Sequence, residues 1–156
     1  VPKENLRRLA RVGKFVAFTR ARPSIRQEEK AEREFAARLV SQFVRLAKCA
    51  AVVLGKKLVD DEVMSLVVGV ANDTSRGISS DICKLLIEHE DGKEIRSMAL
   101  LMDHTEDQLR KMLRFMRKIG MVNLVAKKIK GLRNSKKIWK LTDRMKVLFK
   151  EVHDGR

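Results

Sequence analysis

The spacing of apolar residues changes from a helical period to a strand period at Gly120, and this change limits the possible folds more than any other feature of the chain. Thr105 followed by Gln108 predicts a capping box that starts a helix, and Gly120 predicts its end. Between them the apolar residues form one narrow stripe: Leu109, Met112, Leu113, Met116 and Ile119. Residues 121–129 and 136–141 are rich in strand formers and enclose a basic loop, so we expect a helix followed by a β-hairpin.

Further helices are expected before and after this helix and hairpin. Ser79 or Ser80 caps one helix, and a short second helix is expected over residues 93–102. Thr142 or Asp143 caps a last helix after the hairpin. The expected order in this half of the chain is therefore helix, helix, helix, strand, strand and helix.

The first half of the chain has helical patterns alone. A basic amphipathic helix is expected over about residues 4–22. A capping box that begins at Ser24 starts a long second helix, which ends at Gly55. Asp60 or Asp61 caps a third helix. This part of the sequence predicts a helical bundle.

A cluster of turn-forming residues, from Asn72 to Gly77, lies between two apolar periodic segments. Such a cluster is typical of a boundary between domains. We therefore expect one domain over residues 1–76 and another over residues 77–156. The length of 156 residues suits two small domains, and the expected fold class is mainly α.

Positive charge is concentrated at the two ends of the chain. The formal net charge is +15; residues 1–26 carry +7, residues 27–103 carry −3 and residues 104–156 carry +11. A cationic C-terminal third is typical of a surface that binds a polyanion, and we expect nucleic acid. Solvated helix faces, or contact with acidic protein or lipid, are the alternatives. No apolar run is long enough to span a membrane, so the sequence predicts a soluble protein.

The second half of the chain resembles a winged helix-turn-helix domain over about residues 79–153. The resemblance rests on the element order and on the stretch His104–Val122, which is similar to the family's recognition helix and its turn into the wing. It implies a domain of three helices with a small β-hairpin wing that binds double-stranded DNA, with single-stranded DNA as a further possibility. The expected fold is therefore a helical bundle followed by a winged helix-turn-helix domain.

The implied recognition helix has a polar side opposite its apolar stripe. At about 100° per residue, four side chains project from that side: Asp107, Lys111, Arg114 and Lys118. Gln108 and Arg110 flank it near the helix start, where base edges are usually reached. Thr105 is a further candidate for phosphate contact, although a helix cap is the favoured interpretation.

The implied wing carries six cations within eleven residues. These are Lys127, Lys128, Lys130, Arg133, Lys136 and Lys137. We expect them to follow the phosphate backbone or to enter the minor groove. Trp139 would stack on a base of single-stranded nucleic acid, but its place between Ile138 and Leu141 favours core packing.

Two interpretations of the N-terminal helices remain open. Residues 5–75 are loosely similar to the helical lid of AAA-type ATPases, which implies the C-terminal part of a replication or helicase-type protein. A MarR-like transcription regulator is the alternative, in which these helices form a homodimer interface. A third interpretation concerns the second half of the chain: a winged-helix module that binds protein rather than DNA.

No residue pattern in the sequence points to catalysis. A Walker A loop is absent, and the three histidines are too scattered for a metal site, so we expect neither an enzyme nor a cofactor in this chain. Cys49 and Cys83 lie in apolar helical sequence, which predicts two buried, reduced thiols. The expected location is intracellular: the cytoplasm, at the nucleoid, or the nucleus in a eukaryote.

Overall fold

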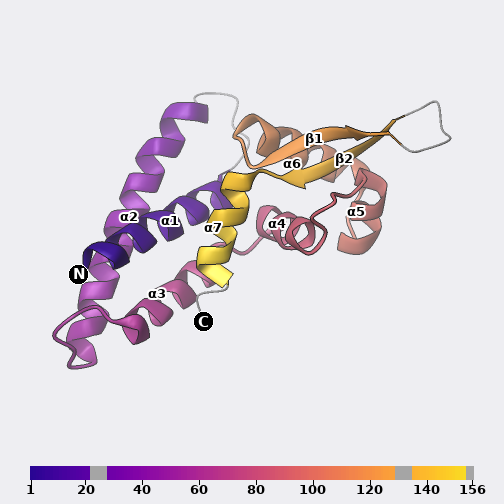
Figure 1. Cartoon of the computed structure of the whole chain (residues 1–156). Coiled ribbons are helices and arrows are strands. Elements are labelled where there is room, and N and C mark those ends of the chain that lie inside the picture. The colour runs from indigo at the N-terminus through magenta and orange to yellow at the C-terminus, as the bar shows by residue number, and fades with distance from the viewer. Residues whose placement is uncertain (22–27, 129–134, 154–156) are drawn as a thin grey trace. The chain divides into compact units, whose positions relative to one another are not determined.

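The computed structural model describes residues 1–21, 28–128 and 135–153, with the backbone alone for residues 28–35. Within these residues the chain forms seven helices and one two-stranded antiparallel sheet (Figure 1). The mainly helical fold class expected from the sequence is confirmed at this level. Over the same residues, none of the helices combines the length and the apolar character needed to cross a membrane.

Helices form the first half of the chain and flank the hairpin in the second half. In chain order the elements are α1 (Lys3–Arg20), α2 (Glu28–Val53), α3 (Asp61–Thr74), α4 (Ile78–Glu88), α5 (Ile95–Met102), α6 (Glu106–Lys118), β1 (Val122–Lys127), β2 (Lys136–Leu141) and α7 (Asp143–His153). The capping box expected at Ser24 lies outside the described residues.

The chain divides into two compact units, which are described separately. The first unit contains residues 1–77 and the residues from Val147 onward, and the second contains residues 78–146. The sequence predicts a second domain over residues 77–156. The structure differs at the C-terminal end, because most of α7 packs with the N-terminal helices rather than with the hairpin.

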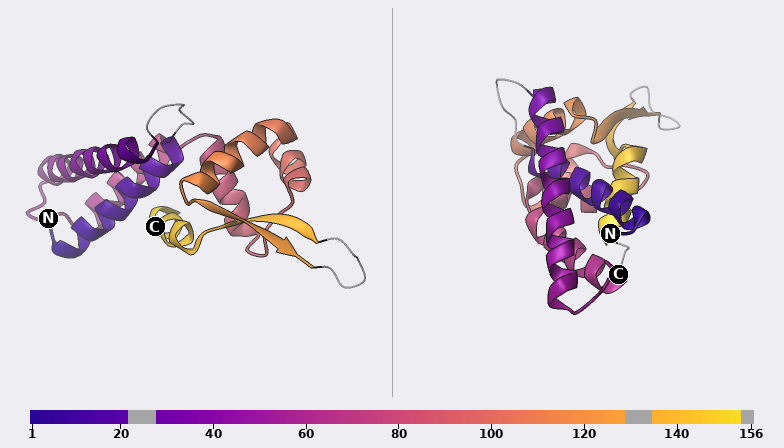
Figure 2. Two further views of the ribbon diagram at one scale, coloured as in Figure 1. Left: turned by 90° about the horizontal axis from the view of Figure 1, so that it is seen from above. Right: turned by 90° about the vertical axis from the view of Figure 1, so that its left-hand side faces the viewer.

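The core of the first unit lies where α1 contacts α2 and α3. Leu9, Val12 and Phe15 of α1 have no exposed surface, and Phe43 of α2 is buried as well. Gly13 allows close contact between the two helices, because a Cβ atom there would lie 2.6 Å from Cγ2 of Val40. Figures 1 and 2 show the two helices packed together in all three views.

The end of α7 is held in the first unit by both apolar and polar contacts. The ring of Phe149 meets Phe15 edge-on, with 5.9 Å between the ring centroids. Glu151 forms an ion pair with Arg11, and Asn72 Nδ2 donates a hydrogen bond to the carbonyl oxygen of Val152 at 3.0 Å. These contacts bridge 80 residues or more along the chain, which explains why local sequence patterns did not reveal them.

The second unit consists of α4, α5 and α6 with the hairpin. Strands β1 and β2 pair antiparallel from Val122 opposite Leu141 to Lys127 opposite Lys136. The backbone of Lys93 adds an isolated bridge to Trp139, with one hydrogen bond in each direction, of 3.1 and 2.8 Å. Trp139 is 7% exposed, which confirms that it packs in the core.

Gly92 allows this bridge to form. It has a φ of +89°, a conformation that favours glycine. A Cβ atom at this position would also lie 2.8 Å from the carbonyl oxygen of Trp139. Both the backbone conformation and the close approach therefore require glycine at the turn before α5.

The structure corrects one expected helix start and decides between the alternatives at two others. Ser79 and Ser80 do not cap α4; they lie inside its first turn and are buried. Asp60 is the cap of α3, where its carboxylate accepts a hydrogen bond from the backbone N–H of Val63. At the start of α7, the hydroxyl of Thr142 accepts a hydrogen bond from the N–H of Met145.

The two cysteines differ in environment, so the expectation that both are buried is wrong. Cys83 is buried in α4, and burial raises the pKa of its thiol to about 12. Cys49 is exposed on α2. The buried face of α2 contains Leu39, Phe43 and Ala47, and a residue two positions after Ala47 points to the other side of the helix.

Candidate nucleic-acid interface

Helix α6 begins with the capping box that its sequence predicts. The hydroxyl oxygen of Thr105 accepts a hydrogen bond from the N–H of Gln108, and Gln108 Oε1 accepts one from the N–H of Thr105, each at 3.3 Å. The acids Glu106 and Asp107 occupy the first turn, where the helix dipole favours negative charge. Thr105 therefore acts as a cap, and the side-chain oxygen of Gln108 is occupied within the helix.

The apolar stripe of α6 is buried as expected. Leu109, Leu113 and Met116 have no exposed surface, which fixes the rotation of the helix on the core of the second unit. The four residues placed on the opposite side are all exposed: Asp107, Lys111, Arg114 and Lys118. The structure thus brings the predicted polar side of α6 to the surface.

Arg110 is less available than its position in the sequence suggests. Its guanidinium lies 3.6 Å from a carboxylate oxygen of Glu106 and 3.5 Å from one of Asp107. Both partners are on the same helix, three and four residues earlier, and such exposed pairs contribute little stability. The pairing nevertheless offsets the charge of Arg110 and gives Asp107 a partner other than a base.

Arg117 is a candidate that the sequence analysis missed. It is exposed on α6, three residues after Arg114 and seven after Arg110, so it lies on the same side of the helix. In the part of the chain that the structure describes, Lys111, Arg114 and Arg117 form no ion pair. At about 100° per residue Arg117 lies beside the apolar stripe, close to Arg110, rather than opposite it, so the helical period that selected Arg114 did not select it.

The hairpin carries exposed cations where it extends beyond the core. Lys127, Lys128 and Lys137 are exposed, whereas Lys136 forms an ion pair with Glu94 at 2.8 Å. Lys130 and Arg133, which the sequence placed at the tip of the wing, lie outside the described residues.

The last residue pair of the hairpin joins two like charges. Lys127 lies directly opposite Lys136 in the antiparallel register. Like charges at directly opposed positions destabilise a sheet, and here Glu94 offsets one of the two.

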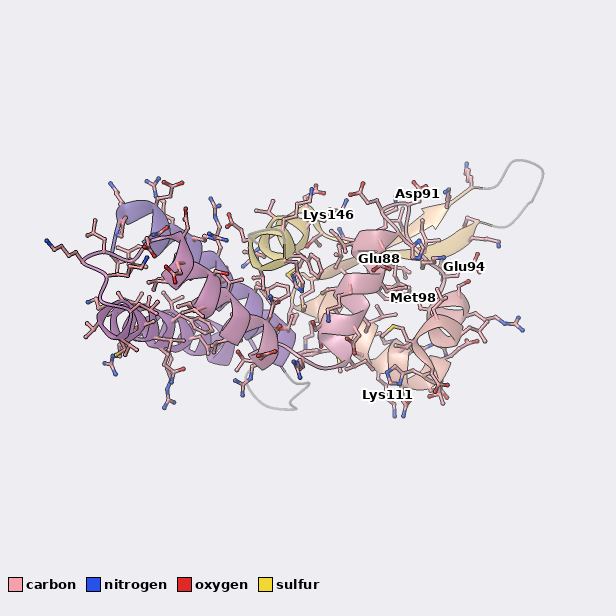
Figure 3. All side chains as sticks on the ribbon, turned by 90° about the horizontal axis from the view of Figure 1, so that it is seen from below. Glu88, Asp91, Glu94, Met98, Lys111 and Lys146 are labelled. Atoms are coloured by element: carbon pink, nitrogen blue, oxygen red, sulfur yellow. The ribbon has the colours of Figure 1, made fainter. Side chains whose placement is uncertain are left out.

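Three acidic residues of the second unit lie apart from Lys111 of α6 (Figure 3), whereas Glu106 and Asp107 belong to α6 itself. In Figure 3, Lys111 is at one edge of the unit, whereas Glu88, Asp91 and Glu94 lie toward the opposite edge, and Met98 points into the interior between them. Met98 has no exposed surface. Helix α6 carries five cations against Glu106 and Asp107, so its net charge is positive.

The second unit also has an open pocket of about 300 Å³, lined by residues of α4 and by the end of α5. Lys84, Glu88 and His104 supply polar groups there, and Leu101 supplies an apolar one. Among the described residues, no three His, Cys, Asp or Glu side chains come together in a way that could hold a metal ion. The pocket includes none of the exposed cations of α6 or the hairpin.

Comparisons with known proteins do not assign the chain to a family. No family model matches the sequence, no curated protein is significantly similar to it, and no solved structure matches its fold.

Proposed function

We propose that the second unit is a winged helix domain that binds double-stranded DNA, with α6 in the major groove and the hairpin on the phosphate backbone. The observation that supports this best is the exposed side of α6, where Lys111, Arg114 and Arg117 form no ion pair with the described residues. The buried stripe of α6 holds that side outward, and the cationic hairpin follows directly in the chain.

The exposed cations divide into two roles on physical grounds. An arginine on a helix in the major groove can donate two hydrogen bonds to guanine, so Arg114 is the main candidate for reading sequence. Lysines are compact point charges that suit phosphate oxygens, so Lys111, Lys127 and Lys128 are expected to position the domain. Arg110 contributes less, because two carboxylates lie beside it.

The variant Arg114→Ala tests the major-groove contact. It should weaken binding to a preferred duplex by about 1–3 kcal/mol and reduce the preference for that sequence over a scrambled one. Lys84→Ala is the control, since Lys84 is an exposed cation of the same unit on α4. Binding isotherms on both duplexes, after selection of a preferred site from a random library, measure the difference.

Neutralising Lys127, Lys128 and Lys137 in the same assay should weaken binding to all duplexes alike and lower the salt dependence of binding. An equal loss on both duplexes from Arg114→Ala would indicate a non-specific cationic binder. Unchanged DNA binding in both sets of variants would instead favour the protein-interaction module. Isotherms measured in parallel on single-stranded DNA show whether the protein binds duplex or single-stranded DNA more tightly.

The wider setting we infer is the C-terminal part of a replication or helicase-type AAA protein. The resemblance of residues 5–75 to the AAA lid supports this, and α1, α2 and α3 are the helices of that stretch. The proposed role of the second unit in that setting is to hold the protein on duplex DNA.

A dimeric MarR-like regulator is the second candidate, and exposed apolar residues of the first unit favour it. Val52, Val53 and Leu58 are 78%, 84% and 64% exposed, near the end of α2 and in the connection to α3. If they form a dimer interface, sedimentation should give twice the monomer mass, and replacing Val52 and Val53 with serine should restore the monomer. A monomer at all concentrations contradicts the regulator and agrees with the lid.

A further inference from the structure

A second cationic surface lies on α2 in the first unit. Between residues 36 and 59 the sequence contains five cations and no acid. The net charge of −3 over residues 27–103 does not reveal this cationic segment, because the acids before and after residues 36–59 outnumber the bases of the whole range.

Three of these cations share the exposed side of α2. Leu39, Phe43 and Ala47 mark the buried side. Arg38, Arg45 and Lys48 are exposed and lie on the opposite side, at intervals of seven and three residues. At 1.5 Å per residue their stripe is about 15 Å long, comparable to the rise of roughly four base pairs.

The three cations are not neutralised within the described chain. Arg38, Arg45 and Lys48 form no ion pair with any described residue. Lys56, at the end of the same segment, is different: its hydrogen bond to Asp60, with a second to Glu62, raises the pKa of its ammonium group and offsets its charge.

Arg8 and Arg11 of α1 are weaker candidates for the same role. Glu151 lies beside Arg8 and forms an ion pair with Arg11, and Glu4 lies in the first turn of α1. The sequence has no acid from residue 36 to the end of α2, and Glu34, four residues before Arg38, has a side chain outside the described residues.

We propose that Arg38, Arg45 and Lys48 form a second binding surface for the phosphate backbone of DNA, separate from α6 and the hairpin. Ser41 and Gln42 lie among the three cations and are exposed; both can donate hydrogen bonds to phosphate oxygens. Contacts to phosphate oxygens do not distinguish one base from another, so the contribution of this surface to affinity is independent of the DNA sequence.

The position of apolar residues on α2 favours DNA over a lipid surface. A helix that binds a membrane places its apolar side into the lipid. On α2 that side, with Leu39 and Phe43, is buried in the fold, and Ser41 and Gln42 separate Arg38 from Arg45. Leu46, between Arg45 and Lys48, is 36% exposed, and the more exposed apolar residues begin at Val52, after the last cation of the stripe.

The test is a variant of the full chain in which Arg38, Arg45 and Lys48 are all replaced by glutamine, measured on duplex DNA over a salt series. If each cation contacts one phosphate, the magnitude of the log–log salt slope falls by about 2.7, and affinity at about 0.1 M salt falls roughly 500-fold when affinity at 1 M salt is unchanged. The matched control keeps the charges at the same positions, as Arg38→Lys, Arg45→Lys and Lys48→Arg, and should keep the wild-type slope. Circular dichroism verifies that both variants fold.

A second control removes the same charge elsewhere, by replacing Lys3, Arg7 and Lys14 of α1 with glutamine. An equal loss of slope in this control overturns the proposal, because binding then follows net charge alone. A wild-type slope in the α2 variant, or a loss seen only on vesicles of anionic lipid, also overturns it. If the α2 variant loses affinity while Arg114→Ala binds normally, the α2 surface stands and the proposed role of α6 fails.

Discussion

Phe15→Ala should destabilise the first unit by about 3–5 kcal/mol, the largest effect expected from a single substitution in this chain. Phe15 has no exposed surface, and its ring meets Phe149 and His153 edge-on, with centroids 5.9 and 5.8 Å away. Removing the ring leaves a cavity at the point where the end of α7 joins α1. Hydrogen exchange of α1 and of the last turns of α7 should accelerate by about two to four orders of magnitude.

Phe15→Leu is the matched control, because it keeps most of the apolar volume and removes only the ring contacts. Phe15→Leu should destabilise the first unit less, by about 1–2 kcal/mol. If the alanine variant does not fold, Phe15→Leu takes its place in the experiment. If the last turns of α7 keep their protection when α1 loses it, the packing of Phe149 on Phe15 is contradicted.

The parts of the fold that the sequence predicted are those with local causes. The capping box at Thr105 and the buried stripe around Leu113 depend on residues three or four positions apart, and both are confirmed. The strand over residues 136–141 has the predicted bounds. These patterns arise within one element, so the period of the sequence contains the information needed to identify them.

The parts that the sequence did not predict depend on contacts between distant segments. The apolar side of α7 suits a helix packed on either unit, and only the contacts of Phe149, Glu151 and Val152 with the N-terminal helices decide which. Serine often caps helices, so the sequence predicts Ser79 as a possible cap, but in α4 Ser79 is buried and its hydroxyl lies 3.6 Å from the sulfur of Met112. Partners far away in the sequence determine both outcomes.

In the candidate site, too, the features with local causes could be predicted and the contacts between distant residues could not. The outward side of α6 followed from its apolar stripe, and the pairing of Arg110 with Glu106 was open to prediction from their spacing of four residues. The pairing of Lys136 with Glu94 joins residues 42 positions apart, and no local pattern indicates it. Sequence therefore predicts which cations are exposed better than it predicts which of them remain unpaired.

Leu113→Ala should destabilise the second unit by about 2–5 kcal/mol. Leu113 has no exposed surface and lies at the middle of the buried stripe of α6, between Leu109 and Met116. Trp139 is the chain's sole tryptophan and belongs to the second unit, so its fluorescence during urea unfolding reports on this unit directly. Leu100→Ala is the control: Leu100 lies on α5 of the same unit and is 80% exposed, and its loss should change stability little.

The Leu113 experiment also bears on DNA binding, because the same rotation of α6 that buries Leu113 turns Arg114 outward. If Leu113→Ala leaves the Trp139 transition where it is in the wild type, the helix is rotated from the orientation described, and Arg114 is no longer the residue expected to read a base. If Leu113→Ala shifts the Trp139 unfolding transition as expected and Arg114→Ala leaves that transition at its wild-type position, the two adjacent residues have separate roles. Leu113 then acts in the core and Arg114 at the surface. Only then does a loss of DNA affinity in Arg114→Ala report a lost contact rather than a weakened fold.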